Sequence, residues 1–171
     1  MIARRVSTIV GIVLVALVAL LAFAAGDEDE NGVSSVLSER TPPVAGIAID
    51  GTNFDVDDQR GSWVLVNFFA TWCPGCVNEH PDLVELEAWG AERGDVSLVS
   101  VVFNEEVERV EEFFAAEGGT WPVLDSPEVP VNFGVAQIPE TFLVSPSGQV
   151  VLHVEGEVQA ERIVEFIEGN S

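Results

Sequence analysis

The chain has 171 residues, with 29 acidic and 7 basic side chains, and its formal net charge at pH 7 is −22. A surface this negative repels phosphate backbones, which excludes nucleic acid as an ordinary partner. All seven basic residues are arginine, and we interpret this composition as a mark of genome base composition and a high-salt habitat rather than of one basic partner.

Residues 1–25 predict an N-terminal transmembrane anchor. Arg4 and Arg5 precede an uncharged apolar stretch from Val6 to Ala25, and four acidic residues follow. A helix of this length, at about 1.5 Å per residue, spans a hydrocarbon core of about 30 Å. The two arginines then stay in the cytoplasm, so we expect a single-pass protein of the cell membrane whose remaining chain is extracytoplasmic. A cleaved signal peptide is the alternative, because the sequence AFA at 22–24 resembles a cleavage site.

An acidic, flexible linker is predicted at 26–42, where a charge run, serines and a proline pair leave little apolar content. One folded domain then covers 43–171, a length that can bury a core. Its first element is a β-hairpin within 46–56, since two short alternating stretches flank the turn dipeptide Asp50-Gly51.

The segment 63–70 is continuously apolar except for Asn67, and this pattern predicts a central strand covered on both faces. A helix is predicted from Pro74 to about Arg93, because apolar residues recur there at mostly helical spacings and Gly94 ends the pattern. Pro81 lies inside this helix and is expected to kink it.

A second buried strand is predicted at 96–103, followed by Asn104 as the N-cap of a helix that carries Val107, Val110, Phe113 and Phe114 and ends at the sequence GGT, 118–120. A short extended piece at 121–127 and a short irregular or helical piece at 128–135 come next.

The sequence 140–156 predicts a β-hairpin that turns at 146–148. An amphipathic helix at 160–168 completes the chain. The order β-α-β-α-β-β-α after the first hairpin predicts an α/β layer fold with a mixed sheet.

Cys73 and Cys76 are the only cysteines, and their C-x-x-C spacing directly follows a predicted strand and opens a predicted helix. The amides and dipole of a helix N-terminus favour a thiolate at Cys73. Cys76 lies one turn later, is expected to sit deeper, and can attack a mixed disulfide at Cys73. Pro74 has no amide hydrogen to leave unpaired and Gly75 adds little bulk, so a partner chain can approach. These features favour a redox-active pair.

Two other interpretations of the cysteines remain open at this stage. A structural disulfide suits an exported protein, although a loop this short restrains the unfolded chain little. A metal site is also conceivable, because Cys73, Cys76, His80 and His153 would form a set of two sulfur and two nitrogen ligands for zinc or copper. A copper or zinc carrier that uses the C-x-x-C pair and His80 is therefore the alternative function from a different class.

The stretch VLVNFFATWCPGCVNEHP, 64–81, resembles the active-site sequence of membrane-anchored thioredoxin-like proteins of the TlpA and ResA type. The stretch GVAQIPETFLVSPSGQV, 134–150, is similar to their second landmark, and the likeness runs from about Pro43 to the end of the chain. Glu79, His80 and the PETF sequence are most similar to the thiol:disulfide interchange protein of cytochrome c maturation, CcmG or DsbE. Phe69 departs from the pattern, since many relatives carry tryptophan there.

The resemblance implies a thioredoxin-like three-layer α/β fold with a central mixed β-sheet and an N-terminal β-hairpin extension. It implies that Cys73 attacks, that Cys76 resolves, and that Pro139 is a cis-proline facing the disulfide. Glu79 matches the acid that shapes the thiol environment, and a carboxylate there raises thiol pKa values and can relay a proton.

Six further residues are candidates for substrate binding. Three flank the cysteines and three lie beside the proline: Trp72, Pro74, Gly75, Ile138, Glu140 and Thr141.

The resemblance further implies a thiol-disulfide oxidoreductase that acts chiefly as a reductant, with no cofactor beyond the Cys73–Cys76 disulfide. The implied substrate is the haem-binding C-x-x-C-H motif of apocytochrome c or another disulfide-bearing exported protein. The implied electron donor is a membrane thiol transporter of the CcdA or DsbD type. A general disulfide oxidant, another TlpA-like redox protein and a peroxidase of the related peroxiredoxin fold are the alternatives within redox chemistry.

Overall fold

The two continuously apolar segments of the sequence form the centre of the sheet. In the computed structural model, which describes residues 33–34 and 39–171, β5 (Trp63–Phe69) and β6 (Val96–Val102) run parallel, in register from Trp63 opposite Val96 to Phe69 opposite Val102. Every residue of β5 is buried, as expected for a strand that is covered on both faces.

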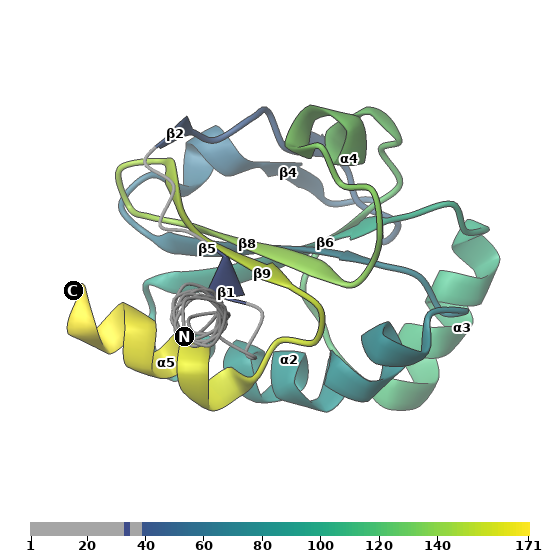
Figure 1. The fold of residues 1–171 in the computed structure, drawn as a ribbon. Coiled ribbons are helices and arrows are strands. Elements are labelled where there is room, and N and C mark those ends of the chain that lie inside the picture. The colour runs from purple at the N-terminus through teal and green to yellow at the C-terminus, as the bar shows by residue number, and fades with distance from the viewer. Residues whose placement is uncertain (1–32, 35–38) are drawn as a thin grey trace, which may run out of the picture. The chain divides into compact units, whose positions relative to one another are not determined.

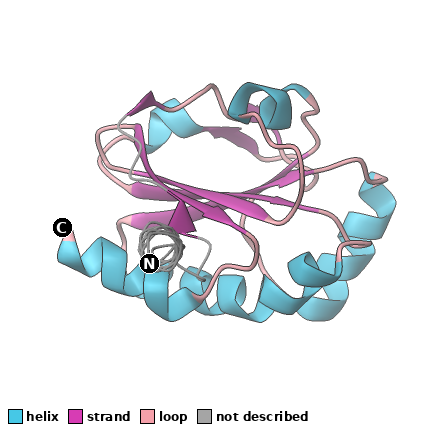
Figure 2. Ribbon diagram, in the orientation of Figure 1, coloured by secondary structure: helices cyan, strands magenta, loops and turns pink. Residues whose placement is uncertain are grey.

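The sheet is mixed, as predicted. Its strand order is β1-β9-β8-β5-β6-β7, and β2 also pairs with β9. The β8–β9 hairpin is antiparallel, β8 is antiparallel to β5, and β7 is parallel to β6. The remaining strands of this sheet, magenta in Figure 2, are β1 (Val33–Ser34), β2 (Glu39–Arg40), β7 (Val123–Leu124), β8 (Glu140–Val144) and β9 (Gln149–Glu155).

Helices cover both faces of the sheet (Figure 1). One face carries α2 (Pro74–Arg93), α3 (Val107–Glu117) and α5 (Ala160–Gly169). The other face carries the hairpin β3 (Ala45–Ile47) and β4 (Asn53–Asp55), the 3₁₀ helix η1 (Val56–Gln59), and α4 (Glu128–Phe133).

Each face of the sheet has its own apolar core. Leu83 and Leu86 of α2 and Ile163 and Ile167 of α5 belong to one buried cluster. The hairpin side has a second cluster, which includes Phe54 and Phe142. The three-layer thioredoxin-like α/β fold is therefore confirmed.

Several predicted elements are confirmed by their local geometry. The N-terminal hairpin turns at Gly51, whose φ is 86°, while the Asp50 carboxylate accepts hydrogen bonds from the backbone and hydroxyl of Thr52. Helix α2 ends at Gly94 in the left-handed conformation that glycine favours. The helix is continuous through Pro81.

The predicted N-cap at Asn104 is wrong. Helix α3 begins two residues later than expected, with Glu106 at the N-cap position. Asn104 instead has a φ of 50°, in the left-handed region that asparagine tolerates better than most residues. The chain uses this residue to turn after β6, so the side chain does not face the first amides of the helix.

The described N-terminal residues begin earlier than the predicted domain. β1 and β2 lie inside the range predicted as a linker, yet they pair with β9 through Val33 opposite Val154 and Glu39 opposite Val150. That pairing was not predicted, because two-residue strands leave no periodic signal.

The predicted anchor at 1–25 lies outside the described residues. Among the residues that the structure describes, no helix has the length and apolar character needed to cross a bilayer.

Candidate active site

The Cys73–Cys76 pair forms a disulfide at the N-terminus of α2. Cys73 is the N-cap, and its Sγ accepts a hydrogen bond of 3.2 Å from the backbone N–H of Cys76. Pro74 occupies the first turn, where a missing N–H costs nothing. The free amides and the dipole at this helix end stabilise negative charge on Cys73 when the bond is reduced.

The two cysteines are buried to the same degree, with 4% and 3% of their surfaces exposed. The expectation that Cys76 sits deeper is therefore not met in this disulfide form. Their neighbours provide the accessible surface instead, since Trp72 is 56% exposed and Val77 is also exposed. A buried disulfide rimmed by exposed apolar side chains is a site at which another protein surface can dock.

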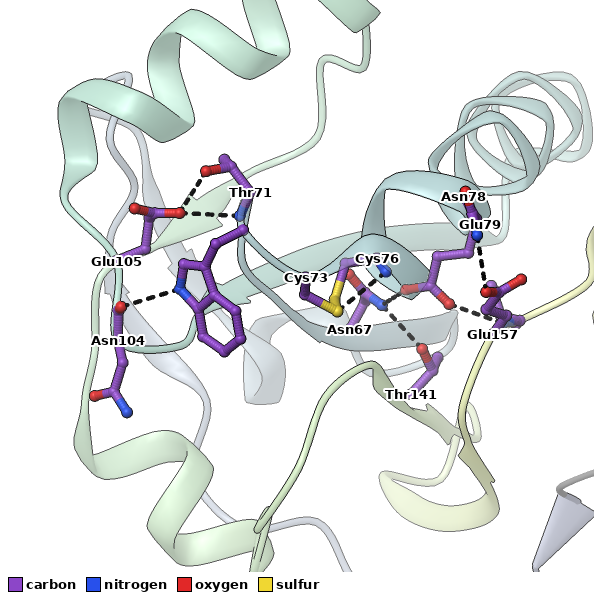
Figure 3. The surroundings of a disulfide bond; sticks show 12 residues. Asn67, Thr71, Cys73, Cys76, Asn78, Glu79, Asn104, Glu105, Thr141 and Glu157 are labelled. Carbon is purple, nitrogen blue, oxygen red and sulfur yellow. Dashed lines mark hydrogen bonds between the residues drawn. A yellow bond between two sulfur atoms is a disulfide. The ribbon is translucent and has the colours of Figure 1, made fainter.

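The second landmark lies against the cysteine loop. The Ile138–Pro139 peptide is cis, and a methyl group placed on Gly75 would lie 3.1 Å from Cδ of Pro139 and 3.3 Å from Oε1 of Glu157. The loop and the proline are thus in close contact, and any larger residue than glycine would have to displace one of these neighbours. Sequence reasoning overlooked Glu157, whose carboxylate also accepts a hydrogen bond from Asn78 (Figure 3).

Glu79 lies one turn beyond Cys76 on α2 and is only 1% exposed. Its Oε1 accepts a 2.8 Å hydrogen bond from Nδ2 of Asn67, and its Oε2 accepts one of 2.8 Å from the backbone N–H of Val158. In Figure 3 its side chain points from the helix back toward Asn67 and the cysteines.

Burial raises the pKa of Glu79 to about 7. The two hydrogen bonds act in the opposite direction, while the negative charges of Glu157 and Asp82 add to the rise. A carboxyl group with this pKa gains and loses a proton near neutral pH, which suits it to proton transfer.

Asn67 links Glu79 to the centre of the sheet. Its Nδ2 also donates to Oγ1 of Thr141 at 3.0 Å, and its Oδ1 accepts from Oγ of Ser100 at 3.3 Å. Ser100 in turn accepts from Nε1 of Trp121 at 2.8 Å. The signal for this group in the sequence was the one polar residue inside the apolar β5, because a buried amide needs partners.

On the other side of the cysteine loop, Glu105 contacts the residues that precede Cys73. Its Oε2 accepts a 3.0 Å hydrogen bond from the backbone N–H of Thr71 and a second bond from the Thr71 hydroxyl. The indole N–H of Trp72 donates to the backbone oxygen of Asn104 at 3.3 Å. The turn after β6 therefore holds the short segment between β5 and α2 that leads into the active site (Figure 3).

The candidates beside Pro139 have partners inside the protein. Thr141 is buried and bonded to Asn67, while Glu140 is paired at 2.9 Å with His153, whose ring stacks on Phe142. Ile138 is partly buried against both cores. Their contact with a substrate stays a prediction.

The four residues of the hypothetical metal site are not brought together. His80 bonds at 3.0 Å to the backbone oxygen of Gly118, with aromatic rings around it, and burial lowers its pKa. His153 is held by Glu140. Across 33–34 and 39–171, no group of three or more His, Cys, Asp or Glu side chains is arranged to hold a metal ion.

A helix-terminal C-x-x-C disulfide, a cis-proline against it and a thioredoxin-like sheet define a protein that exchanges dithiols and disulfides. A family profile described as Redoxin matches residues 37–166. The chain belongs to the Redoxin family, and it is a thiol-disulfide oxidoreductase of the type represented by the relatives below.

The chain is 33% identical over 122 residues to the thiol-disulfide oxidoreductase ResA of Geobacillus thermodenitrificans, covering 70% of each chain. It is 28% identical over 152 residues to the thiol:disulfide interchange protein HelX of Rhodobacter capsulatus, covering 85% of this chain and 84% of the relative. A solved thiol:disulfide interchange protein from Chlorobium tepidum superposes with a TM-score of 0.69 at 29% identity, over 78% of this chain and 98% of that one.

Proposed function

We propose that this chain is a membrane-tethered, extracytoplasmic reductant of protein disulfides, and that its substrate is the C-x-x-C-H motif of apocytochrome c. The apolar sequence at 6–25 supports the tether. The similarity to a ResA and to a HelX supports the type of substrate. The observation that carries the reducing direction is the pair of carboxylates, Glu79 and Glu157, beside the cysteine loop.

Negative charge near the cysteines favours a reductant for an electrostatic reason. A thioredoxin-like protein is a strong oxidant when its reduced form is stabilised, chiefly through a low thiol pKa. Glu79 and Glu157 repel a thiolate, and this raises the thiol pKa and destabilises the reduced form. The disulfide form then gains relative stability, so the dithiol gives up its electrons more readily.

The proposed cycle transfers one electron pair. The Cys73 thiolate attacks the substrate disulfide, forms a mixed disulfide and releases one substrate thiolate, which takes a proton from water. The Cys76 thiol then gives its proton to the Glu79 carboxylate and attacks Sγ of Cys73. The second substrate thiolate leaves and takes the proton that Glu79 received from Cys76, so Glu79 is a carboxylate again, the substrate is reduced and the Cys73–Cys76 disulfide is formed.

The oxidised protein needs a source of two electrons and two protons to begin a new cycle. A membrane dithiol transporter of the CcdA or DsbD type is the proposed donor, because it would deliver thiols to the same side of the membrane as the anchored domain. An extracytoplasmic reductant requires such a donor, since thiols in that compartment tend to be oxidised.

The first test is the reduction potential of the full-length chain in mild detergent, measured against glutathione and dithiothreitol, with thiols counted by alkylation. We expect a potential near or below about −220 mV, in the range of thioredoxin-like reductants. A value near about −120 mV would make the protein an oxidant. Metal analysis of the same sample checks the carrier alternative, which requires bound zinc or copper and no cycling thiols.

The second test concerns the substrate. A disulfide-closed peptide with the C-x-x-C-H motif is compared with the same peptide in which the histidine is alanine, and the rate of reduction by the dithiol form is measured for both. We expect faster reduction of the histidine peptide, because the negative surface and Glu157 attract a cationic imidazole. Equal rates for the two peptides would indicate a general reductant of disulfides and would contradict the proposed specificity for the C-x-x-C-H motif.

A further inference from the structure

We propose that Asn67 is a positioning residue for Glu79, and that Ser100 orients the Asn67 amide so that its N–H groups face Glu79 and Thr141. This arrangement concerns the exchange reaction itself and does not depend on the proposed substrate. The side-chain hydrogen bonds of Asn67 are to Glu79, Thr141 and Ser100 and not to a cysteine sulfur, so Asn67 acts through Glu79.

The direction of each hydrogen bond follows from the chemistry of the donors. An indole N–H can only donate, so the Ser100 oxygen accepts from Trp121. The single hydroxyl proton of Ser100 is then left for Asn67, which must present its oxygen to receive it. The Asn67 nitrogen consequently faces the opposite way, toward Glu79 Oε1 and Thr141 Oγ1. Without the Ser100 hydroxyl, this orientation of the amide is selected only by the ionised Glu79 carboxylate, which accepts hydrogen bonds and cannot donate them. Once Glu79 is protonated, its O–H can donate to the flipped amide oxygen, so the loss of Ser100 favours the neutral acid.

The backbone supports the same arrangement. Asn67 is the cross-strand neighbour of Ser100 on β6 and of Thr141 on β8, so the three side chains lie side by side on three adjacent strands. All three are buried, as is Trp121. Water cannot replace a lost bond at such a site, which makes the orientation of the amide matter more than it would at the surface.

The protonation of Glu79 depends on two opposing effects, burial of its carboxyl group and hydrogen bonds donated to it. Burial favours the neutral acid, whereas the N–H groups of Asn67 and Val158 favour the carboxylate. Removing the Asn67 donor leaves one of the two bonds, so the neutral form gains. Glu79 then stays protonated to higher pH and accepts the Cys76 proton only there.

The test compares Asn67→Leu, which is close to asparagine in shape and has no donor, with Ser100→Ala, which keeps the Asn67 donor but frees the orientation of the amide and also removes the acceptor of the Trp121 indole N–H. Ser126→Ala is the matched control, because Ser126 is also a buried serine and its hydroxyl lies near Gly46, away from this chain of bonds. The titration of Glu79 is followed by carbon-13 NMR in the oxidised full-length chain in detergent, with the signal assigned by its loss in Glu79→Gln. The pH profile of peptide-disulfide reduction is measured on the same proteins.

We expect the Glu79 midpoint to rise by about one pH unit in Asn67→Leu and by about half a unit in Ser100→Ala, with the activity profile moving upward by the same amounts. Ser126→Ala should leave both unchanged. A midpoint that is unchanged or lowered in Ser100→Ala overturns the proposal, even when Asn67→Leu fails to fold. A loss of stability alone, with an unmoved titration, shows that the residues are merely structural and also overturns it.

Discussion

Two carboxylates lie on opposite sides of the cysteine loop, and their environments push their proton affinities apart. Glu105 accepts two hydrogen bonds from Thr71 and lies 3.9 Å from Arg109. Burial acts to raise the pKa of Glu105, but the bonds from Thr71 and the nearby positive charge outweigh it and lower the pKa. Glu79 also accepts two bonds, yet burial dominates there and raises its pKa to about 7.

The difference shows that two glutamates, which have the same side chain, serve different purposes in one site. Glu105 stays ionised across the neutral range and keeps its hydrogen bonds to Thr71, which lies two residues before Cys73. Glu79 changes its charge near neutral pH, so it can exchange a proton with a thiol. Substitutions on the two sides should therefore have effects of different kinds.

The largest effect is expected where both sides meet, at the cysteines. Cys73→Ser should abolish disulfide reduction, because a hydroxyl is a far weaker nucleophile than a thiolate. Cys76→Ser should still attack and should accumulate a mixed disulfide with the substrate, visible by mass spectrometry under non-reducing conditions. Trapping by Cys73→Ser instead of Cys76→Ser would reverse the assigned roles.

Glu79→Gln should lower the rate of substrate reduction at pH 7 by about 10²-fold, the lower end of what a general acid–base group contributes. The step in the pH profile near 7 should disappear as well. The exposed Glu85→Gln on the same helix is the matched control, and equal rates in the two variants would remove the proton-transfer role.

The same Glu79 variant should change the pH dependence of stability. In the unfolded chain Glu79 ionises near its usual pKa of 4.5, and in the folded chain only near 7. The contribution of Glu79 to the free energy of unfolding is therefore fully present below pH 4.5. It is lost as pH rises through 7, which lowers the free energy of unfolding by about 3 kcal/mol. Urea unfolding at pH 4 and pH 8 should show Glu79→Gln more stable than the parent only at pH 8.

Glu105→Ala should destabilise the protein by about 2 kcal/mol at pH 7, because Thr71 loses a charged hydrogen-bond acceptor. Since the pKa of Glu105 is lowered, the destabilisation caused by Glu105→Ala should shrink as pH falls through that pKa. This pH dependence has the opposite sign to the one expected for Glu79. Urea titrations at pH 7 and pH 3 measure both, with the exposed neighbour Glu106→Ala as control. A pH-independent loss would mean that packing, not charge, holds the loop.

The smallest effect is expected at Gly75, on the Glu79 side of the loop. Its added methyl in Gly75→Ala meets Pro139 and Glu157 at 3.1 and 3.3 Å, so these neighbours must move by a few tenths of an ångström. We expect the free energy of unfolding to change by no more than about 1 kcal/mol. The KM for the peptide disulfide should rise about two- to threefold, which corresponds to about 0.5 kcal/mol. Gly169→Ala, which has open space around it, is the control.

Much of the fold was predictable because its signals are local. The apolar runs of β5 and β6, the helical spacing of α2 and its glycine end, and the two hairpins each follow from a few adjacent residues. Asn104 shows the limit of such reasoning, since a residue that often caps helices was used here to turn the chain. Both uses of asparagine have the same local sequence signal, and the following backbone decides between them.

The sequence alone determined the cysteine pair, its place at the start of a helix and the family landmark around Pro139, because each depends on residue type and short spacing. Tertiary structure alone decided what surrounds them. Asn67, Ser100 and Thr141 come from three strands, and Glu79 meets Val158 across 79 positions of sequence. Burial and long-range hydrogen bonds set the proton affinities of Glu79 and Glu105, and neither quantity exists until the chain has folded.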